Sequence, residues 1–238
     1  MDFLAVKVSA SLASFRRPLD HNYQRTLPLP PPTTLIGLAG AALGLSDGEI
    51  WHRNSPLRAL SVSVLSLQEP GRARDMWTVM KIKNNRIADR SPYFRELLCF
   101  VRYVLLYGGP RQLLESLAAS FADPVYPLSL GREDELLTID EVGIYQAEQG
   151  VPRFRGTILP IHLREHSFRP LLRPGIRFEM PVVEILPLSF AVDEQGLRQP
   201  LQRVPLTFLP FDLEVELPHL EPTLTFKGRS FTWVNTRS

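Results

Sequence analysis

Two groups of basic and aromatic residues have side chains suited to binding a polyanion. The first group, shortly after the opening apolar segment, consists of Arg16, Arg17, His21, Tyr23 and Arg25. The second group, in residues 72–95, holds seven Lys and Arg against two Asp, with Trp77 and Tyr93 between them. Cations pair with phosphates and aromatic rings stack on unpaired bases, so this mixture is typical of single-stranded nucleic-acid sites. A solvated hairpin with Trp77 in the core explains the second group equally well.

No metal site, cofactor or covalent nucleophile is predicted. His162 and His166 are four residues apart, but the sequence around them is typical of an extended segment, which separates such residues by about 13 Å. Cys99 is the single cysteine, which excludes an internal disulfide and zinc sites that need two thiolates. Its apolar surroundings, "LLCFV", predict a packed core residue. The chain contains neither a P-loop nor a GxSxG motif.

The charge distribution separates the two halves of the chain. Residues 1–112 carry a net charge of +7 and residues 113–238 a net charge of −5, although the whole chain carries only +2. A basic half suits a polyanion, and an acidic half suits a basic partner subunit. The longest strongly apolar run, residues 35–45, is much shorter than the roughly 20 residues that span a membrane. The opening residues do not resemble a signal peptide, so we expect a cytoplasmic protein.

The elements that must position these residues follow from hydrophobic periodicity. Alternating apolar residues predict strands in residues 3–10 and 60–67, and a strand leading into a basic hairpin or loop in residues 75–94. Residues 95–109 fit a helix or a buried strand, and a strand is favoured. Residues 110–124 predict an amphipathic helix bounded by Pro110 and Pro124. "VYPLSLGREDELLTI" predicts a strand, a glycine turn and a second strand.

The segment "LPLPPPTTLIGLAGAALGL", residues 27–45, predicts a helix with an unusually bare face. Thr33 and Thr34 are able to cap its start. Gly37, Gly40 and Gly44 fall along one stripe, and each glycine costs about 1 kcal/mol in helix propensity. Close packing of the helix against a sheet is the favoured explanation, and close approach of a nucleic-acid backbone is the alternative.

The order strand, helix, strands, helix, strand predicts an α+β fold with a ferredoxin-like βαββαβ domain in residues 1–145. From residue 146 the helical pattern ends, and prolines separate short extended runs. Residues 146–238 are therefore expected to form a smaller β-rich C-terminal part.

Four segments together resemble one protein family. In order they are "SASLASFRRP", "LPLPPPTTLIGLAGAALGL", "RELLCFVRYVLLYGG" and "FADPVYPLSLGRED", and they cover roughly residues 3–140. They resemble the CRISPR-associated RAMP proteins of family five, the subunits of Cascade surveillance complexes that hold the 5′ handle of the CRISPR RNA. The resemblance implies a ferredoxin-like domain with a β-hairpin thumb and a variable C-terminal part.

The resemblance also implies partners and site residues. The partners are the 5′ handle of the CRISPR RNA, the backbone and large subunits of the complex, and possibly target DNA through the complex. Residues 70–95 would form the thumb, with Trp77, Lys81, Lys83, Arg86 and Arg90 near RNA. Arg132 lies at a family-typical turn. The first basic group and the helix after Thr33 and Thr34 would flank the RNA.

One branch of this family, in type I-C systems, is a metal-independent ribonuclease. Its adjacent Lys-His pair is absent here, so we expect a non-catalytic subunit from a type I-B-like system. His21, Tyr23 and Lys81 or Lys83 remain the candidates for catalysis if the chain does cut RNA. A further alternative is a protein-only docking subunit, whose assembly would depend less on salt than phosphate binding does.

Overall fold

The fold is built around one mostly antiparallel sheet with helices on one face. The computed structural model describes residues 2–172, 175 and 179–236. The sheet has the order β16-β3-β5-β1-β6. Its main strands and helices, in chain order, are β1 (Asp2–Ala13), α1 (Pro32–Leu43), β3 (Ser61–Ser66), β5 (Arg86–Gly108), α3 (Arg111–Ala122) and β6 (Leu137–Gln146). Strand β5 lies between β1 and β3, which is the split βαβ arrangement of a ferredoxin-like domain, as the sequence predicts.

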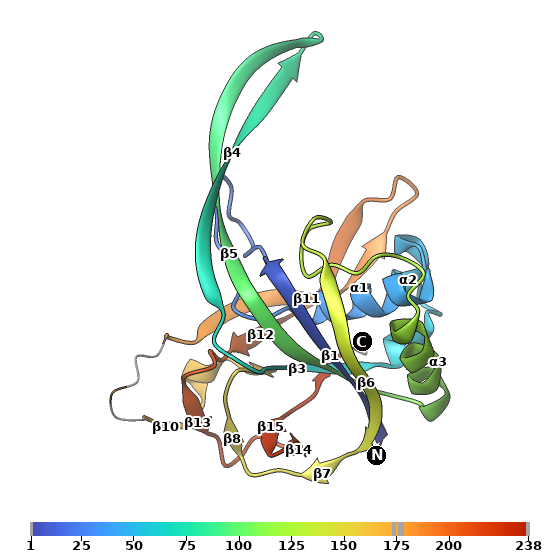
Figure 1. Ribbon diagram of the computed structural model, residues 1–238, viewed down its shortest axis with the longest axis vertical. Coiled ribbons are helices and arrows are strands. Elements are labelled where there is room, and N and C mark those ends of the chain that lie inside the picture. The colour runs from blue at the N-terminus through green and yellow to red at the C-terminus, as the bar shows by residue number, and fades with distance from the viewer. Residues whose placement is uncertain (1, 173–174, 176–178, 237–238) are drawn as a thin grey trace.

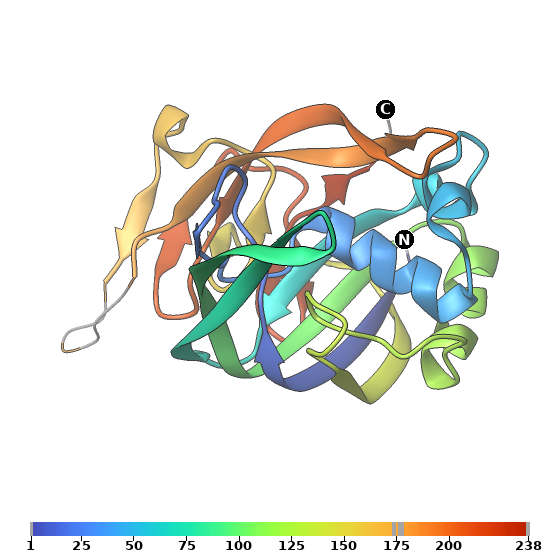
Figure 2. The same cartoon turned by 90° about the horizontal axis from the view of Figure 1, so that it is seen from above.

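Both faces of the central sheet are covered over most of its area. Leu4, Val6 and Val8 of β1 belong to the main core, on the face that carries α1 and α3. Phe3 and Ala5 point to the opposite face, into a second core. Figure 2 shows α1 above the sheet and a hairpin of the C-terminal part above α1.

A long hairpin, hereafter the thumb, projects from the sheet (Figure 1). It consists of β4 (Gly71–Lys83) and the first half of β5, paired from Gly71 opposite Cys99 to Lys83 opposite Arg86. Asn84 and Asn85 form its turn with φ of 50° and 56°, as a two-residue hairpin turn of type I′ requires. The basic hairpin and the strand assignment of residues 95–109 are thereby confirmed.

Helix α1 differs from the prediction at its start and in its packing. It begins at Pro32, and Pro31 occupies the N-cap without a side-chain hydrogen bond. Thr33 and Thr34 therefore lie in the first turn, and the predicted threonine cap is wrong. A Cβ on Gly40 would lie 2.4 Å from Ile50, in the short helix α2 (Asp47–Trp51). Close packing is thus real at Gly40, but against a helix rather than a sheet.

The segment before β6 also departs from the prediction. Residues 124–136 form turns with one isolated bridge, Ser129 to Leu136, so the first of the two strands expected in "VYPLSLGREDELLTI" is absent. The prolines and the Gly131 turn leave too few consecutive ladder donors for a strand. Helix α3 is confirmed, with Pro110 as its N-cap and Leu114, Leu117 and Phe121 buried.

Residues after Gln146 are β-rich and share cores with the first part of the chain. Strand β16 (Val234–Asn235) extends the central sheet beside β3. Phe226, Phe231 and Trp233 form the second core with Phe3. The remaining elements are β2 (Tyr23–Gln24), β7 (Glu148–Gln149), β8 (Arg153–Phe154), β9 (Ile158–Leu159), β10 (Arg169–Leu171), β11 (Val182–Val192), β12 (Arg198–Phe208), β13 (Glu214–Glu216), β14 (Leu224–Phe226), β15 (Arg229–Phe231) and two 3-10 turns, Pro56–Ala59 and Leu163–Glu165.

Candidate nucleic-acid interface

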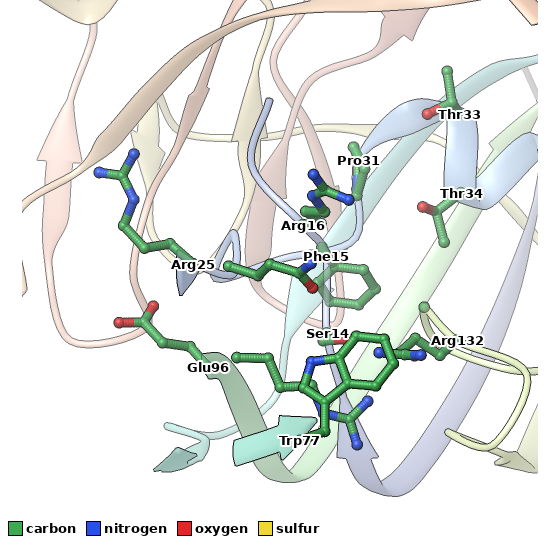
Figure 3. A pocket seen from close by; sticks show the side chains of 13 residues that line it. Ser14, Phe15, Arg16, Arg25, Pro31, Thr33, Thr34, Trp77, Glu96 and Arg132 are labelled. Carbon is green, nitrogen blue, oxygen red and sulfur yellow. The ribbon is translucent and has the colours of Figure 1, made fainter. Parts of the chain in front are cut away.

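A cleft of about 470 Å³ lies where the thumb leaves the sheet, hereafter the basal cleft. Figure 3 shows its side chains converging from three regions that are far apart in sequence. The loop after β1 and the start of α1 form one wall, the base of the thumb forms the second, and the turn before β6 forms the third. It is lined by Ser14, Phe15, Arg16, Gln24, Arg25, Pro31, Thr33, Thr34, Trp77, Arg95, Glu96, Gly131 and Arg132.

The turn before β6 is held against the end of β1 by a buried carboxylate. Glu135 is only 2% exposed and accepts hydrogen bonds from the Ser14 hydroxyl at 2.7 Å and from the Arg132 amide at 3.0 Å. Arg95 lies 3.9 Å away from the same carboxylate. Gly131 has a φ of +124°, and a Cβ there would lie 2.0 Å from the Ser14 carbonyl oxygen. Only glycine fits this close approach.

The loop after β1 is fixed by an ion pair between a buried carboxylate and a half-exposed arginine. Asp20 is 8% exposed and accepts from the Arg25 backbone amide at 2.7 Å and from its guanidinium at 2.8 Å. These bonds lower the pKa of Asp20 below its ordinary value. Arg16 donates to the backbone carbonyl of Asp20. The pairing leaves the Arg16 side chain exposed at the cleft.

An aromatic side chain and an arginine meet across the cleft. The guanidinium carbon of Arg132 lies 4.5 Å from the centre of the Trp77 ring, within the range of a cation–π contact. Tyr93 packs edge-on against Trp77 with ring centres 6.1 Å apart. Arg95, one strand away, is paired with Asp75 at 2.9 Å. Trp77 therefore lines the cleft and does not lie in the core.

The side of the cleft next to the loop carries a carboxylate as well. Glu96 accepts from the Tyr23 hydroxyl at 2.9 Å and from the Thr26 amide at 3.3 Å. The bond to Glu96 raises the pKa of Tyr23 above its ordinary value. Arg74 lies 5.8 Å from the Tyr23 ring. Tyr23 is thus a neutral, hydrogen-bonded phenol at the edge of the site.

The start of α1 adds a favourable field for an anion. Thr33 and Thr34 line the cleft in the first turn of this 12-residue helix, where the helix dipole favours negative charge. The Thr34 amide already donates to the Pro31 carbonyl at 2.9 Å, so the dipole and the threonine hydroxyls are what this turn offers an anion. The lining includes four arginines (Arg16, Arg25, Arg95 and Arg132) and one carboxylate, that of Glu96. A single-stranded nucleic acid with a phosphate near the arginines and a base near Trp77 would match this arrangement.

The structure brings six of the predicted site residues to the cleft and places the others elsewhere. Arg16, Arg25, Thr33, Thr34, Trp77 and Arg132 line it, and Tyr23 is at its edge. Arg17 turns away and pairs with Glu184 of β11. His21 is exposed in the loop. The distal half of the thumb carries Lys81, Lys83, Arg86 and Arg90, all exposed, and Lys81 pairs with Asp89 at 3.1 Å.

Several residues that build the cleft were not among the predicted site residues. Arg95 is the last cation of the second basic group but was not among the residues expected near RNA. Arg95 and Glu96 lie in an apolar stretch that fits a helix or a strand, so the directions of their side chains could not be inferred. Glu135 is one of three acids in "REDE", and only the fold shows that this one is buried. The Gly131 turn was the available signal, because a glycine beside charged residues often marks a close backbone approach.

The remaining sequence expectations concern other kinds of site. In residues 2–172, 175 and 179–236, no three His, Cys, Asp or Glu side chains are grouped to hold a metal ion. Over the same residues, no helix is sufficiently long and apolar to span a membrane. Cys99 is partly exposed rather than packed in the core, because it lies where the thumb meets the sheet.

Comparisons with known proteins give a family and a fold. The family model described as "CRISPR-associated protein (Cas_Cas5)" matches residues 3–195. A chain titled "CRISPR RNA-guided surveillance complex" is 20% identical, covers 92% of each chain and has a TM-score of 0.53. A CRISPR protein from Archaeoglobus fulgidus is 12% identical, covers 97% of this chain and 98% of its own, and has a TM-score of 0.55.

Two further comparisons are more limited. A solved structure titled "Crystal structure of Cas protein" is 27% identical, but covers 56% of this chain and 58% of its own, with a TM-score of 0.39. No curated protein matches the sequence.

Proposed function

Because the chain belongs to the Cas5 family of CRISPR-associated proteins, we propose that it is the subunit of a type I-B-like surveillance complex that holds the 5′ handle of the CRISPR RNA. The observation that carries the proposal is the basal cleft, where Arg132 lies against Trp77 and Arg16 is exposed at the opening. A neighbour with the same fold is titled as part of an RNA-guided surveillance complex. The proposed partners are the guide RNA, the backbone and large subunits and, through them, target DNA, in the cytoplasm.

The roles of the cleft residues follow from their chemistry. Arg16 and Arg132 would bind phosphates or base edges, because a planar guanidinium suits both. Trp77 would stack on an unpaired base of the handle. Thr33 and Thr34 would place hydroxyls and the helix dipole near a phosphate. The distal half of the thumb would contact the RNA beyond the cleft through Lys81, Lys83, Arg86 and Arg90. These contacts would add affinity without recognising the 5′ end of the RNA.

The subunit is proposed to be non-catalytic. Metal-independent cleavage of RNA needs a general base near the 2′-hydroxyl, and none of the five histidines in the chain lines the cleft. The hydrogen bond to Glu96 favours the neutral form of Tyr23, which makes it a poorer base. Incubating the chain with labelled repeat RNA and a chelator tests this. A product that disappears in His21→Ala or Tyr23→Phe would overturn the non-catalytic role.

Co-purification with guide RNA tests the proposal directly. The tagged chain is co-expressed with its neighbouring subunits and a repeat-spacer array, and the 5′ ends of the bound RNA are sequenced. We expect Arg16→Glu/Arg132→Glu to abolish retention of guide RNA with a uniform repeat-derived end. Arg53→Glu is the control, because Arg53 is exposed and outside the cleft. Retention of the same RNA by the double variant would rule out the cleft.

The same preparation distinguishes RNA binding from protein-only docking. Phosphate contacts make affinity fall steeply with salt, whereas an apolar protein interface is much less sensitive. Arg17→Glu tests the role of Arg17 apart from that of Arg16. It would break the ion pair with Glu184 and lower the stability of the fold, while leaving the cleft arginines in place. An intact complex that carries no guide RNA at any salt concentration would favour docking.

A further inference from the structure

Phe100 of β5 combines an unusual backbone conformation with an outward-facing ring. Its φ is +53°, which is a rare conformation for a bulky residue, and its side chain is 72% exposed. Leu98 and Val101, which are three positions apart, both belong to the main core, so the alternation of the strand breaks between them. Gln68 donates a side-chain hydrogen bond to the Phe100 carbonyl, which holds the conformation. Strained residues of this kind concentrate at functional sites.

The ring borders a groove on the face of the sheet opposite α1. The second core covers the lower part of this face, but the upper part is open, and a groove of about 400 Å³ runs over β1, β5 and β6. Arg102, two residues along β5, is exposed beside Phe100 and has no ion-pair partner within the described part of the chain. The polar side chains of this open-face groove are those of Ser9, Ser11, Gln68, Arg102 and Thr138.

We propose that the open-face groove binds an unpaired nucleotide of a single strand, separately from the basal cleft. The base stacks on the Phe100 ring, and the Arg102 guanidinium pairs with a phosphate. The hydroxyls of Ser9, Ser11 and Thr138 supply hydrogen-bond donors and acceptors for the sugar. Ser9 already donates to Asp140 at 3.0 Å, which leaves its lone pairs free to accept from a ligand hydroxyl.

The composition of the groove favours a nucleotide over a protein partner. Its large exposed apolar side chains are Phe100 and Leu136, whereas docking faces present larger contiguous apolar areas. One ring beside one unpaired guanidinium and several hydroxyls is instead the combination that sequence-tolerant single-strand sites use. The segment leading into β6 contributes to both sites, with Gly131 and Arg132 in the basal cleft and Leu136 and Thr138 in the groove, so one nucleic-acid strand or two could contact the chain at both places.

Fluorescence anisotropy with a labelled oligouridylate and a labelled oligothymidylate tests the site on the full chain. The parent is Arg16→Ala/Arg132→Ala, which removes cleft binding so that failure of the proposed function does not affect the result. Phe100→Gly removes the ring while suiting the positive φ, so the fold is kept. We expect it to weaken binding about tenfold, the loss that one base–aromatic stack produces. Phe100→Trp should keep the affinity, Arg102→Gln should reduce it, and Arg53→Gln should leave it unchanged.

The outcomes distinguish guide RNA from a DNA strand as the ligand of the groove, and distinguish both from a protein subunit. Tighter binding of oligouridylate supports the proposal with guide RNA as the source, and equal or tighter binding of oligothymidylate supports it with a DNA strand. Binding of both probes within twofold of the parent in Phe100→Gly, or no binding by the parent, would overturn it. If Phe100→Gly instead loses a co-purifying subunit without any change in oligonucleotide binding, the groove is a protein contact and the proposal is wrong.

Discussion

At the scale of single residues, the basal cleft depends on groups that cannot themselves touch a ligand. Glu135 and Asp20 are buried carboxylates that hold the turn before β6 and the loop after β1. Each satisfies several donors, so removing either would leave buried polar groups unpaired, which costs more than the bond itself contributed. Buried carboxylates therefore hold in place the loop and the turn that carry the cleft arginines.

Gly131→Ala should unfold more easily than the natural chain. The positive φ and the overlap of a Cβ with the Ser14 carbonyl together predict a loss of about 2–4 kcal/mol in the free energy of unfolding. Urea unfolding measures this. Gly48→Ala is the matched control, because a Cβ on Gly48 meets nothing within 4 Å and alanine suits a helix better by about 1 kcal/mol. Equal effects of the two substitutions would contradict the strained turn.

The Asp20–Arg25 pair should make stability fall in acid. The folded pKa of Asp20 lies below its ordinary value, so its stabilisation is complete above the ordinary value of about 3.9 and is lost as the pH falls through the folded pKa. Asp20→Asn should therefore lower the melting temperature at neutral pH, and the difference should shrink in acid. Thermal melts across this range check the sign. A difference that stays constant in acid would exclude the ion pair as its cause.

At the scale of elements, β5 decides the shape of the molecule and was the hardest element to predict. Leu98, Val101 and Leu105 recur at helical spacing, yet they belong to a strand whose alternation breaks at Phe100. The strand assignment came from the valines, the aromatics and the closing glycines. The break itself could not be foreseen, because it depends on Gln68 from another segment.

Short-range signals predicted the elements, and long-range contacts decided the site. The ferredoxin-like order, the basic hairpin and both long helices could be read from periodicity and proline positions. The cleft could not, since Ser14 reaches Glu135, 121 positions away in the chain, and Arg17 reaches Glu184. Adjacent Arg16 and Arg17 were indistinguishable in the sequence, but their environments differ completely in the fold.

The distal thumb should be dispensable for folding. Ile82 and Ile87 near its tip are exposed, and no residue of 79–91 belongs to a core cluster of the described structure. Replacing 79–91 by Asn-Gly would join Thr78 to its partner Pro92 and should leave the melting temperature nearly unchanged.

The chain with the trimmed thumb also distinguishes two contributions to RNA binding, the overall affinity and the recognition of the RNA 5′ end. Guide RNA with a uniform 5′ end should still be retained, because Trp77 remains. The slope of log affinity against log salt should become shallower by about 0.7 for each lost phosphate contact. Loss of the uniform end in a folded, trimmed chain would assign the reading to the distal lysines and arginines instead.

At the scale of the whole molecule, the β-rich C-terminal residues complete the cores of the first part. Ile158, Leu206 and Phe208 enter the main core, and Trp233 packs edge-on against Phe3 at 6.1 Å between ring centres. The two parts therefore share their cores, and we expect each to depend on the other for stability.

Trp233→Ala should test this dependence. Removing a buried tryptophan costs about 3–5 kcal/mol, and here the cavity would open between both parts of the chain. Leu197→Ala serves as the control, since Leu197 is exposed. The two parts should still unfold in one transition in denaturant, monitored by tryptophan fluorescence and far-UV circular dichroism. Two separate transitions would show that the parts are stable independently.

One continuous strand of 23 residues serves both the sheet and the thumb. At about 3.3 Å per residue its contour length is roughly 75 Å. No loop interrupts it, although its side-chain alternation breaks at Phe100. A load applied along the thumb would therefore pass along this one backbone into the middle of the sheet. There the hydrogen-bond ladders with β1 and β3 resist it in shear, many bonds at once. Because Trp77 of the thumb and Arg132 of the turn before β6 meet at the foot of this strand, a ligand bound between them would tie the thumb to the sheet.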